Sequence, residues 1–266
     1  MHLAPTPRQR IQTPMLDLEF AELTDRGLMR SNNEDALGHV LPSNAAGVQS
    51  LGWFFALADG MGGHAHGEVA SQLAIDTALE GFRKATKDTT HASLLPVLVR
   101  EANAAVYNAG HTKHGPHARM GTTFVACALR FDSAVVSHIG DSRCYLFRNG
   151  NGTQLTGDHT VAEEQLRLGI LSPKETAASE GRHLLTRSLG GDLAVTADTI
   201  AVNVLPGDTF LLCSDGLHGY VPDTTLVKIL QQYTDLDQTA KALVAAALDA
   251  GGHDNVSVQL IRVRTV

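Results

Sequence analysis

The sequence predicts an α+β fold in which mostly antiparallel sheets are covered by helices. Three observations indicate this class. Apolar runs of strand length recur along the chain, turn dipeptides typical of hairpins follow several of them, and pairs of amphipathic helices interrupt the series of strands. The regular alternation of strand and helix that builds a parallel sheet is missing from the pattern, which favours antiparallel pairing.

Three strands are predicted before the first helix. Apolar and acidic side chains alternate over Met15–Leu23, as in a half-buried strand, and Ala36–Val40 fits a second strand. The stretch Pro42–Ser50 is rich in turn residues. Trp53–Ala58 then contains six apolar residues without a break, which indicates a strand buried on both faces.

Two helices and a run of strands come next. Apolar residues recur at helical spacing over residues 68–84 and again over residues 93–108. The dipeptides Asn149-Gly150 and Asn151-Gly152 are strong hairpin signals. Strand-like runs precede them at residues 121–129, 134–139 and 144–148.

The periodicity changes between about residues 158 and 197. Val161–Leu168 and Pro173–Ala178 look helical, and the segment is too long for a hairpin loop, so it is predicted to be a folded flap. Regular elements resume after it, with strands at residues 199–204 and 209–213, helices at 223–230 and 237–250, and a last strand at 256–263.

Length and composition set further limits. Residues 1–14 hold three prolines and mixed charge, so we expect a flexible extension before a single domain at residues 15–266. The net charge of −7 disfavours nucleic-acid binding, and no apolar run approaches the roughly 20 residues that span a bilayer. Three isolated cysteines in apolar runs fit a reducing compartment, which predicts a cytoplasmic protein.

Acidic residues mark the ends of several predicted strands and loops. They are Glu34, Asp35, Asp59, Asp215 and Asp254, each near Gly or Asn. If these ends converge, the cluster carries more negative charge than a protein holds without cations. Carboxylate, carbonyl and water ligands select Mg²⁺ or Mn²⁺ over Zn²⁺. A single strand that ends in an Asp-Gly turn would be an ordinary structural feature, but five such acids favour a metal site.

A pair of ions would suit chemistry at phosphorus. A bridging carboxylate holds two metals about 3.5–4 Å apart, and a water between them becomes a nucleophile because its pKa falls. Arg30 fits this scheme, since a guanidinium binds two phosphate oxygens at once. The alternative for Arg30 is a surface ion pair with Glu34, one helical turn along the chain.

Six motifs in register resemble the bacterial branch of the PPM family, the metal-dependent protein phosphatase 2C-like Ser/Thr phosphatases. The resemblance covers about residues 16–264. It implies a central antiparallel β-sandwich flanked by pairs of antiparallel helices, in four layers α-β-β-α, with the flap as a subdomain. The motifs are Thr24-Asp-x-Gly-x-x-Arg30-x-x-Asn-Glu-Asp35, Asp59-Gly-Met-Gly-Gly-His64, Gly121-Thr-Thr, Gly140-Asp-Ser-Arg143, Ser214-Asp215-Gly216 and Asp254-Asn255.

The resemblance also implies roles for individual residues. Asp59 would bridge the two metals, the Gly60 carbonyl would bind one ion, and Asp215 and Asp254 would bind the other. Glu34 and Asp35 would hold metal-bound waters, and Arg30 would clamp the substrate phosphate. His64 and His159 match histidines of bacterial members and are candidates to assist proton transfer or substrate binding. Asp141 and Arg143 look structural.

One position departs from the family pattern. Bacterial members usually have an Asp just before Met-Gly-Thr-Thr that helps to hold a third metal, and Arg119 stands there in this sequence. A cation replaces an anion at this place. We therefore expect third-metal binding to be weak or absent, with Arg119 free to contact Asp215, Asp254 or substrate.

The predicted function is a cytoplasmic, monomeric protein phosphatase. It would hydrolyse phospho-Ser/Thr monoesters with a water that bridges two Mg²⁺ or Mn²⁺ ions, without a covalent phosphoenzyme. Its partners would be phosphorylated Ser/Thr proteins and a cognate Ser/Thr kinase, with no nucleic acid and no membrane. Two alternatives stay open. One is a catalytically impaired phosphoprotein-binding module on the same fold, and the other is a metal-dependent phosphoesterase for small molecules.

Overall fold

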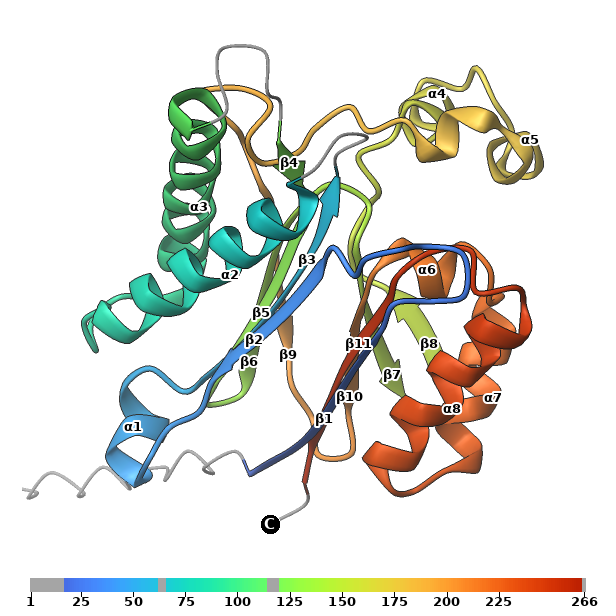
Figure 1. Ribbon diagram of the computed structural model, residues 1–266. Helices are drawn as coiled ribbons and strands as arrows, with labels where there is room; N and C mark the ends of the chain where they lie inside the picture. Colours follow the sequence, from blue (N-terminus) through green and yellow to red (C-terminus); the bar gives the residue numbers. More distant parts are fainter. Residues whose placement is uncertain (1–16, 62–65, 114–119, 265–266) are drawn as a thin grey trace, which may run out of the picture.

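The computed structural model describes residues 17–61, 66–113 and 120–264. Within these ranges the strands form two antiparallel sheets that pack face to face as a sandwich (Figure 1). The first sheet has the order β1 (Leu18–Asp25), β11 (Val256–Val263), β10 (Thr209–Cys213), β7 (Arg143–Arg148), β8 (Asn151–Gln154). The second has the order β2 (Asp35–Val40), β3 (Trp53–Met61), β5 (Phe124–Arg130), β6 (Ser133–Ile139), β9 (Asp198–Asn203), and β4 (Gly121–Thr122) pairs with β3.

The unbroken apolar run Trp53–Ala58 lies in strand β3, which packs against other side chains on both faces. Phe55 and Leu57 point between the two sheets, where they pack with side chains of β10 and β11. Phe54, Ala56 and Ala58 point the other way, toward the covering helices. Both faces of the strand are therefore buried, as the sequence predicts.

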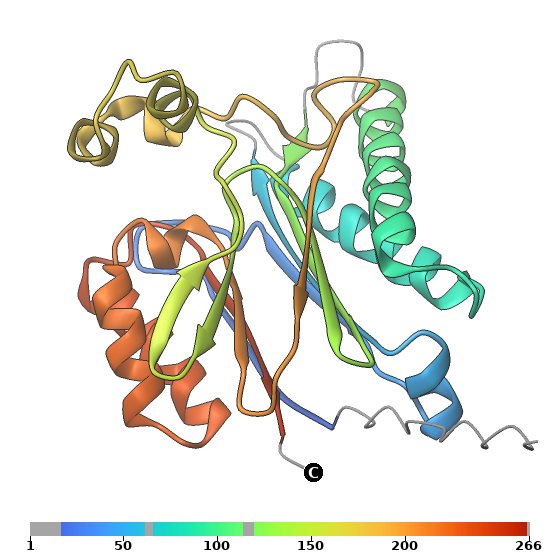
Figure 2. The same cartoon turned by 180° about the vertical axis from the view of Figure 1, so that it is seen from behind.

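Each sheet has helices on its outer face (Figure 2). Helices α2 (Gly67–Lys84) and α3 (His91–Lys113) cover the second sheet, and Phe82 of α2 stacks on Phe54 with ring centroids 4.7 Å apart. Helices α7 (Asp223–Gln232) and α8 (Leu236–Asp249) cover the first sheet, where Leu243 packs in the same core as Val258. The four-layer α-β-β-α prediction is confirmed.

The segment at residues 158–197, which we call the flap, lies at one end of the sandwich (Figure 1). It contains α4 (Val161–Arg167), α5 (Pro173–Ala178) and the short 3-10 helix η1 (Glu180–His183). A bridge between Thr160 and Leu185 closes the base of the flap, and a bridge between Thr122 and Leu189 ties the flap to the rest of the fold. Both predicted flap helices are present.

Three local predictions were wrong or incomplete. The turn-rich stretch contains a short helix, α1 (Ala45–Ser50), which the Asn44 side chain caps by accepting from the Gly47 amide. Only the first Asn-Gly pair forms the β7–β8 turn, with positive φ at Asn149 and Gly150, and the second pair lies in β8. A one-turn helix, α6 (Asp215–His218), follows β10, where the sequence indicated no helix.

Among the described helices, even the 23-residue α3 is too polar to act as a bilayer-spanning segment. The predicted extension at residues 1–14 lies outside the described residues.

Candidate metal centre

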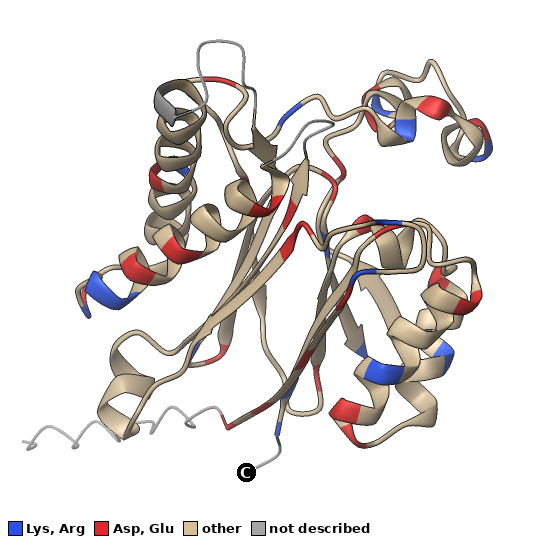
Figure 3. Ribbon diagram, in the orientation of Figure 1, with Lys and Arg blue, Asp and Glu red and all other residues tan. Residues whose placement is uncertain are grey.

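Four of the five predicted acids line one cavity of about 490 Å³. They are Glu34, Asp59, Asp215 and Asp254, and the cavity also includes Gly60 and Arg30. Figure 3 shows acidic residues gathered at the end of the sandwich nearest the flap. Asp35 lies beside this cavity, because it is the β2 neighbour of Asp59 in the β2–β3 ladder. Positions more than 200 residues apart in the sequence therefore meet at one sheet edge.

Two threonines fix the backbone of Asp59. Its amide donates to Thr123 Oγ1 at 2.9 Å, and its carbonyl accepts from Thr122 Oγ1 at 2.9 Å and from the Thr123 amide at 2.9 Å. These contacts give the Gly121-Thr-Thr motif a specific task. The motif holds the end of β3 so that the Asp59 carboxyl faces the cavity.

Close backbone packing surrounds the next residue. The Gly60 amide donates to the Glu34 carbonyl at 3.0 Å. A Cβ atom on Gly60 would stand 2.2 Å from the carbonyl oxygen of Gly67, the first residue of α2, so no larger residue fits without a shift. The α2 N-terminus thus lies against the Glu34 backbone, and the helix dipole favours a carboxylate there.

Asn255 holds the two cavity loops together. Its side-chain oxygen accepts from the Glu34 amide at 2.8 Å, and its amide nitrogen donates to the carbonyls of Arg26 at 2.9 Å and Asn32 at 2.8 Å. The neighbouring Asp254 accepts from Arg30 at 2.7 Å. Arg30 therefore pairs with Asp254 across the cavity and not with Glu34, the surface partner considered from the sequence.

The acids raise one another's pKa values. Burial, followed by repulsion from Asp35, Asp215 and other acids, raises the pKa of Asp59 well above its usual range. Burial and the charge of Asp254 raise the pKa of Asp215, which also shares a hydrogen bond with Asp59. Burial is also the main cause that raises the pKa of Glu34. Without cations, this cluster therefore holds protons at pH values where free carboxyls are charged.

Asp35 carries a further sign of a missing partner. Its Oδ2 accepts from Ser214 Oγ at 2.8 Å, but its buried Oδ1 has no hydrogen-bond partner among the described residues. Burial raises the pKa of Asp35 to about 7, against the opposing effect of hydrogen bonds from Ser257 and Ser214. A buried, unpartnered carboxylate oxygen is costly unless a cation or its water reaches it.

This donor set fits hard divalent cations. Carboxylates and the Gly60 carbonyl are oxygen ligands of the kind that Mg²⁺ and Mn²⁺ prefer. Among the described residues, three donor atoms lie within 4.8 Å of one another only at His138, His159 and Asp198, outside this cavity. The cavity acids are thus spaced more widely, which leaves room for the waters that Mg²⁺ usually keeps.

The cavity contains residues that the sequence interpretation did not assign to it. Asp141 lines it, although the sequence suggested only a structural turn, and burial together with the charge of Asp215 raises the pKa of Asp141 to about 8. His183 from the flap, Tyr220 and His253 also line it. Asp141 follows Gly140 at a strand end, so the rule that selected the other acids would have found it. His183 had no such signal.

Three predicted residues are not among those described as lining the cavity, for two different reasons. His64 and Arg119 lie outside the described residues. His159 is buried and is not among the described residues that line the cavity, because it lies behind the turn at Gly140.

Comparisons with known proteins agree with this geometry. A sequence model of the family described as Protein phosphatase 2C matches residues 30–251. The serine/threonine phosphatase stp of Listeria monocytogenes is 34% identical over 90% of this chain and 93% of that protein. The serine/threonine protein phosphatase PstP of Mycobacterium tuberculosis is 39% identical over 91% of this chain and 44% of that protein. The crystal structure of the PstP catalytic domain in complex with two manganese ions superposes with a TM-score of 0.80 at 36% identity, covering 94% of this chain and 100% of that one.

Proposed function

This chain belongs to the protein phosphatase 2C family and is a protein-serine/threonine phosphatase, and we propose that it hydrolyses phospho-Ser/Thr monoesters by direct attack of water at a two-metal centre. The observation that carries the proposal is the single cavity into which Asp59, Asp215 and Asp254 converge. The two manganese ions in the PstP catalytic domain support a pair of ions here. Mg²⁺ and Mn²⁺ both suit the donors.

Each acid has a proposed place in holding the ions. Asp59 would bridge them, the Gly60 carbonyl would bind one, and Asp215 and Asp254 would bind the other. Glu34 and Asp35 hold waters of the metal shell. When bound, two such ions supply a water of lowered pKa as the nucleophile and neutralise charge on the phosphate oxygens.

Arg30 is proposed to clamp the phosphate. Its side chain is about half exposed and lies at the cavity wall, where it now pairs with Asp254. A cation on Asp254 would leave the guanidinium free to bind two phosphate oxygens, which would orient the phosphate in the cavity. His64 is proposed as a proton donor to the leaving alkoxide, a role that contributes about 10²–10⁴-fold when such a donor is in place.

Substrates and partners follow from the class of reaction. We propose phosphorylated Ser/Thr proteins as substrates and a Ser/Thr kinase as the opposing enzyme. The monomeric state, the cytoplasmic location and weak third-metal binding at Arg119 stay predictions, which sedimentation, cell fractionation and metal titration of Arg119→Asp would test.

A direct test measures hydrolysis of p-nitrophenyl phosphate and of a phosphothreonine peptide, with Mn²⁺ and with EDTA. We expect activity only with metal, and a loss of at least about 10²-fold in Asp59→Asn, because metal stabilisation supplies several kcal/mol and 1.36 kcal/mol is tenfold in rate. Activity that survives EDTA would contradict the metal mechanism. Peptide binding without turnover would favour the binding module, and preference for nucleotides over phosphopeptides would favour a small-molecule phosphoesterase.

A further inference from the structure

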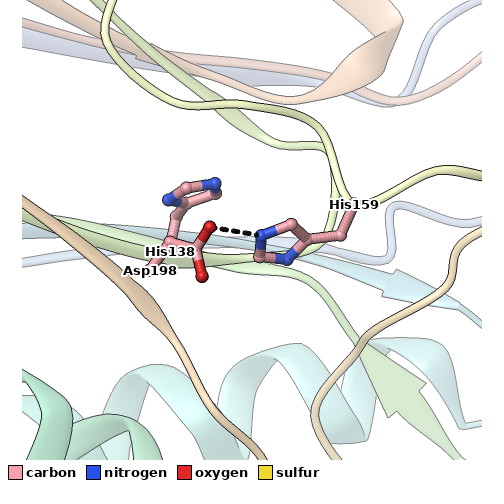
Figure 4. A group of neighbouring side chains, drawn as sticks. All are labelled: His138, His159 and Asp198. Atoms are coloured by element: carbon pink, nitrogen blue, oxygen red, sulfur yellow. Dashed lines mark ion pairs between the residues drawn. The ribbon is translucent and has the colours of Figure 1, made fainter. Parts of the chain in front are cut away.

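A second polar cluster lies outside the acid cavity and consists of His138, His159 and Asp198 (Figure 4). His138 is 1% and His159 4% exposed, whereas the Asp198 side chain is about half exposed. His159 is the second residue of the flap. Asp198, the first residue of β9, directly follows the flap. The cluster therefore lies where both ends of the flap meet the second sheet.

The arrangement of these side chains disfavours a metal ion between them. The two imidazole rings stack, with centroids 4.7 Å apart and planes at 24°, so their in-plane lone pairs do not converge on one point. His159 Nδ1 accepts from the Gly140 amide at 3.1 Å, which places the proton of the neutral ring on Nε2. Arg187 already pairs with Asp198 at 2.9 Å.

The same contacts give His159 a different task. We infer that Asp198 and His159 form a dyad that positions the turn at Gly140 and Asp141, and so holds the Asp141 carboxyl at the acid cavity. Asp198 Oδ2 lies 3.4 Å from Nε2 of His159, as the dashed line in Figure 4 marks, so the carboxylate faces Nε2–H, which has no hydrogen-bond partner among the described residues. The other ring nitrogen, Nδ1, accepts from the Gly140 amide. The role of this dyad in catalysis rests on the proposed phosphatase function.

The turn depends on outside support. Gly140 has φ of +99°, and a Cβ there would stand 2.7 Å from the Thr123 side chain. Both polar backbone atoms of Gly140 are held by His159, because the His159 amide also donates to the Gly140 carbonyl at 3.0 Å. A single residue therefore fixes the strained entry to Asp141.

Two further contacts connect this turn to the metal ligands. Thr123 Oγ1 lies 2.7 Å from Ser142 Oγ and also accepts from the Asp59 amide. Buried His218 donates to the Asp141 carbonyl at 2.9 Å. A shift of the turn would thus move Asp141 directly and Asp59 through Thr123, although neither Asp198 nor His159 lines the cavity among the described residues.

The dyad also connects the flap to the turn. The Thr186 amide donates to the His159 carbonyl at 2.8 Å, and Arg187 of the flap pairs with Asp198. Burial, then the charges of His138 and Arg187, lower the pKa of His159 to about 4, which keeps the ring neutral and able to accept from Gly140 at neutral pH. Asp198 and His159 are therefore positioning residues for the reaction.

The first experiment compares three variants in steady-state kinetics with p-nitrophenyl phosphate and saturating Mn²⁺. We expect kcat to fall about tenfold in Asp198→Ala, because removing such supporting partners costs about 10–100-fold, with KM within about twofold. Asp198→Asn keeps an oxygen that faces Nε2–H and should recover most of kcat. Glu164→Ala is the matched control, since Glu164 is 47% exposed, pairs with Arg167 and lines the same flap-side cavity as Asp198, but does not touch His159.

The second experiment needs no activity and uses the metal-free wild-type protein. Ring-nitrogen NMR should show His159 protonated on Nε2 and unprotonated on Nδ1, unchanged by added Zn²⁺, and amide exchange at Gly140 should speed up in Asp198→Ala. Protonation on Nδ1, Zn²⁺ binding at these rings, or equal kcat and equal Gly140 exchange in Asp198→Ala and wild type would overturn the inference. If the wild type were inactive, the phosphatase proposal would fail while NMR and exchange still decided the dyad.

Discussion

At the scale of single residues, the cavity is organised by polar groups that never need to touch a substrate. Thr123 accepts from the Asp59 amide and contacts Ser142, and Asn255 joins the loops that carry Glu34 and Asp254. The hydrogen bonds of both side chains join them to backbone groups or to a neighbouring hydroxyl. Their effect on the reaction is to set where the carboxyls stand.

Replacement of Thr123 tests this role. Thr123→Val keeps the shape but leaves the Asp59 amide without its acceptor, so we expect a loss of about 1–3 kcal/mol in the free energy of unfolding, the cost of an unsatisfied buried donor. Urea denaturation of the metal-free protein measures it. Thr123→Ser retains the hydroxyl and should recover most of the loss, and equal destabilisation by both variants would indicate a packing effect instead.

Substitution of Arg30 tests phosphate binding separately from metal binding. Because its guanidinium pairs with Asp254, Arg30→Ala removes a competitor for that carboxylate as well as the phosphate clamp. We expect KM for a phosphopeptide to rise about tenfold, in line with the loss of a charge-assisted pair, while Mn²⁺ affinity stays equal or increases. Steady-state kinetics and calorimetry give the two values. A fall in Mn²⁺ affinity would show that Arg30 supports the acids instead of competing for them.

At the scale of secondary-structure elements, β3 is the central support of the site. It lies between β2 and β5 inside the second sheet and delivers Asp59 and Gly60 to the cavity. Its two faces belong to different cores, one between the sheets and one under the helices. The metal centre therefore depends on both cores.

Alanine substitution on either face should be similarly destabilising. Phe54→Ala and Phe55→Ala each remove a fully buried ring, and we expect each to lower the free energy of unfolding by about 3–5 kcal/mol. Thr153→Ala on exposed β8 is the control and should stay within about 0.5 kcal/mol of wild type. A small effect for only one of the two phenylalanines would mean that one face of β3 is less tightly packed than described.

The elements were predictable where the sequence signal is local. Alternation and helical spacing identified the long strands and helices, and the family resemblance supplied their layers. The short α1 was missed because six residues with one capping Asn give no periodic pattern. The identical dipeptides Asn149-Gly150 and Asn151-Gly152 could not be ranked from sequence, because the choice depends on β7–β8 register and on contacts such as Val227 against Gly152.

The candidate site was predictable to the same extent. Acids at strand ends could be recognised singly, and four of them do share a cavity. Asp141 follows the same strand-end rule and was overlooked, whereas the position of His159 could not be predicted, since burial behind a turn and contact with Asp198 arise only in the folded chain. His183 reaches the cavity because the flap folds over it, which no local pattern records.

At the scale of the whole molecule, clustered acids couple stability to pH. Burial and mutual repulsion raise the folded-state pKa of Asp35 to about 7 and of Asp141 to about 8, above their ordinary 3.8. The folded protein then binds more protons than the unfolded chain between about pH 4 and 8, so this contribution is full in acid and is lost as pH rises. The histidines whose pKa is lowered act in the opposite direction below about pH 7.5, because the unfolded chain binds protons there that the folded protein does not; they are His91, His138, His159 and His218.

The metal-free protein should therefore lose stability between pH 7.5 and 8.5, where these histidines are almost fully neutral in both the folded and the unfolded chain. Melting temperatures in EDTA at these two pH values measure the loss of stability. Asp141→Asn should reduce the difference between the two melting temperatures. Mn²⁺ requires charged carboxylates, so the stabilisation that it gives should increase over the same interval. A melting temperature in EDTA that rises from pH 7.5 to 8.5 would contradict the raised pKa values.

The central claim is that acids from distant parts of the chain hold a pair of divalent cations. Calorimetric titration of Mn²⁺ into the metal-free protein tests it most directly, with Asp59→Asn beside the wild type. We predict two ions per wild-type chain, and affinity weakened at least about tenfold for both in Asp59→Asn, because that carboxylate is shared. A wild type that binds no Mn²⁺ at millimolar concentration, or an Asp59→Asn variant that binds two ions equally well, would contradict the claim.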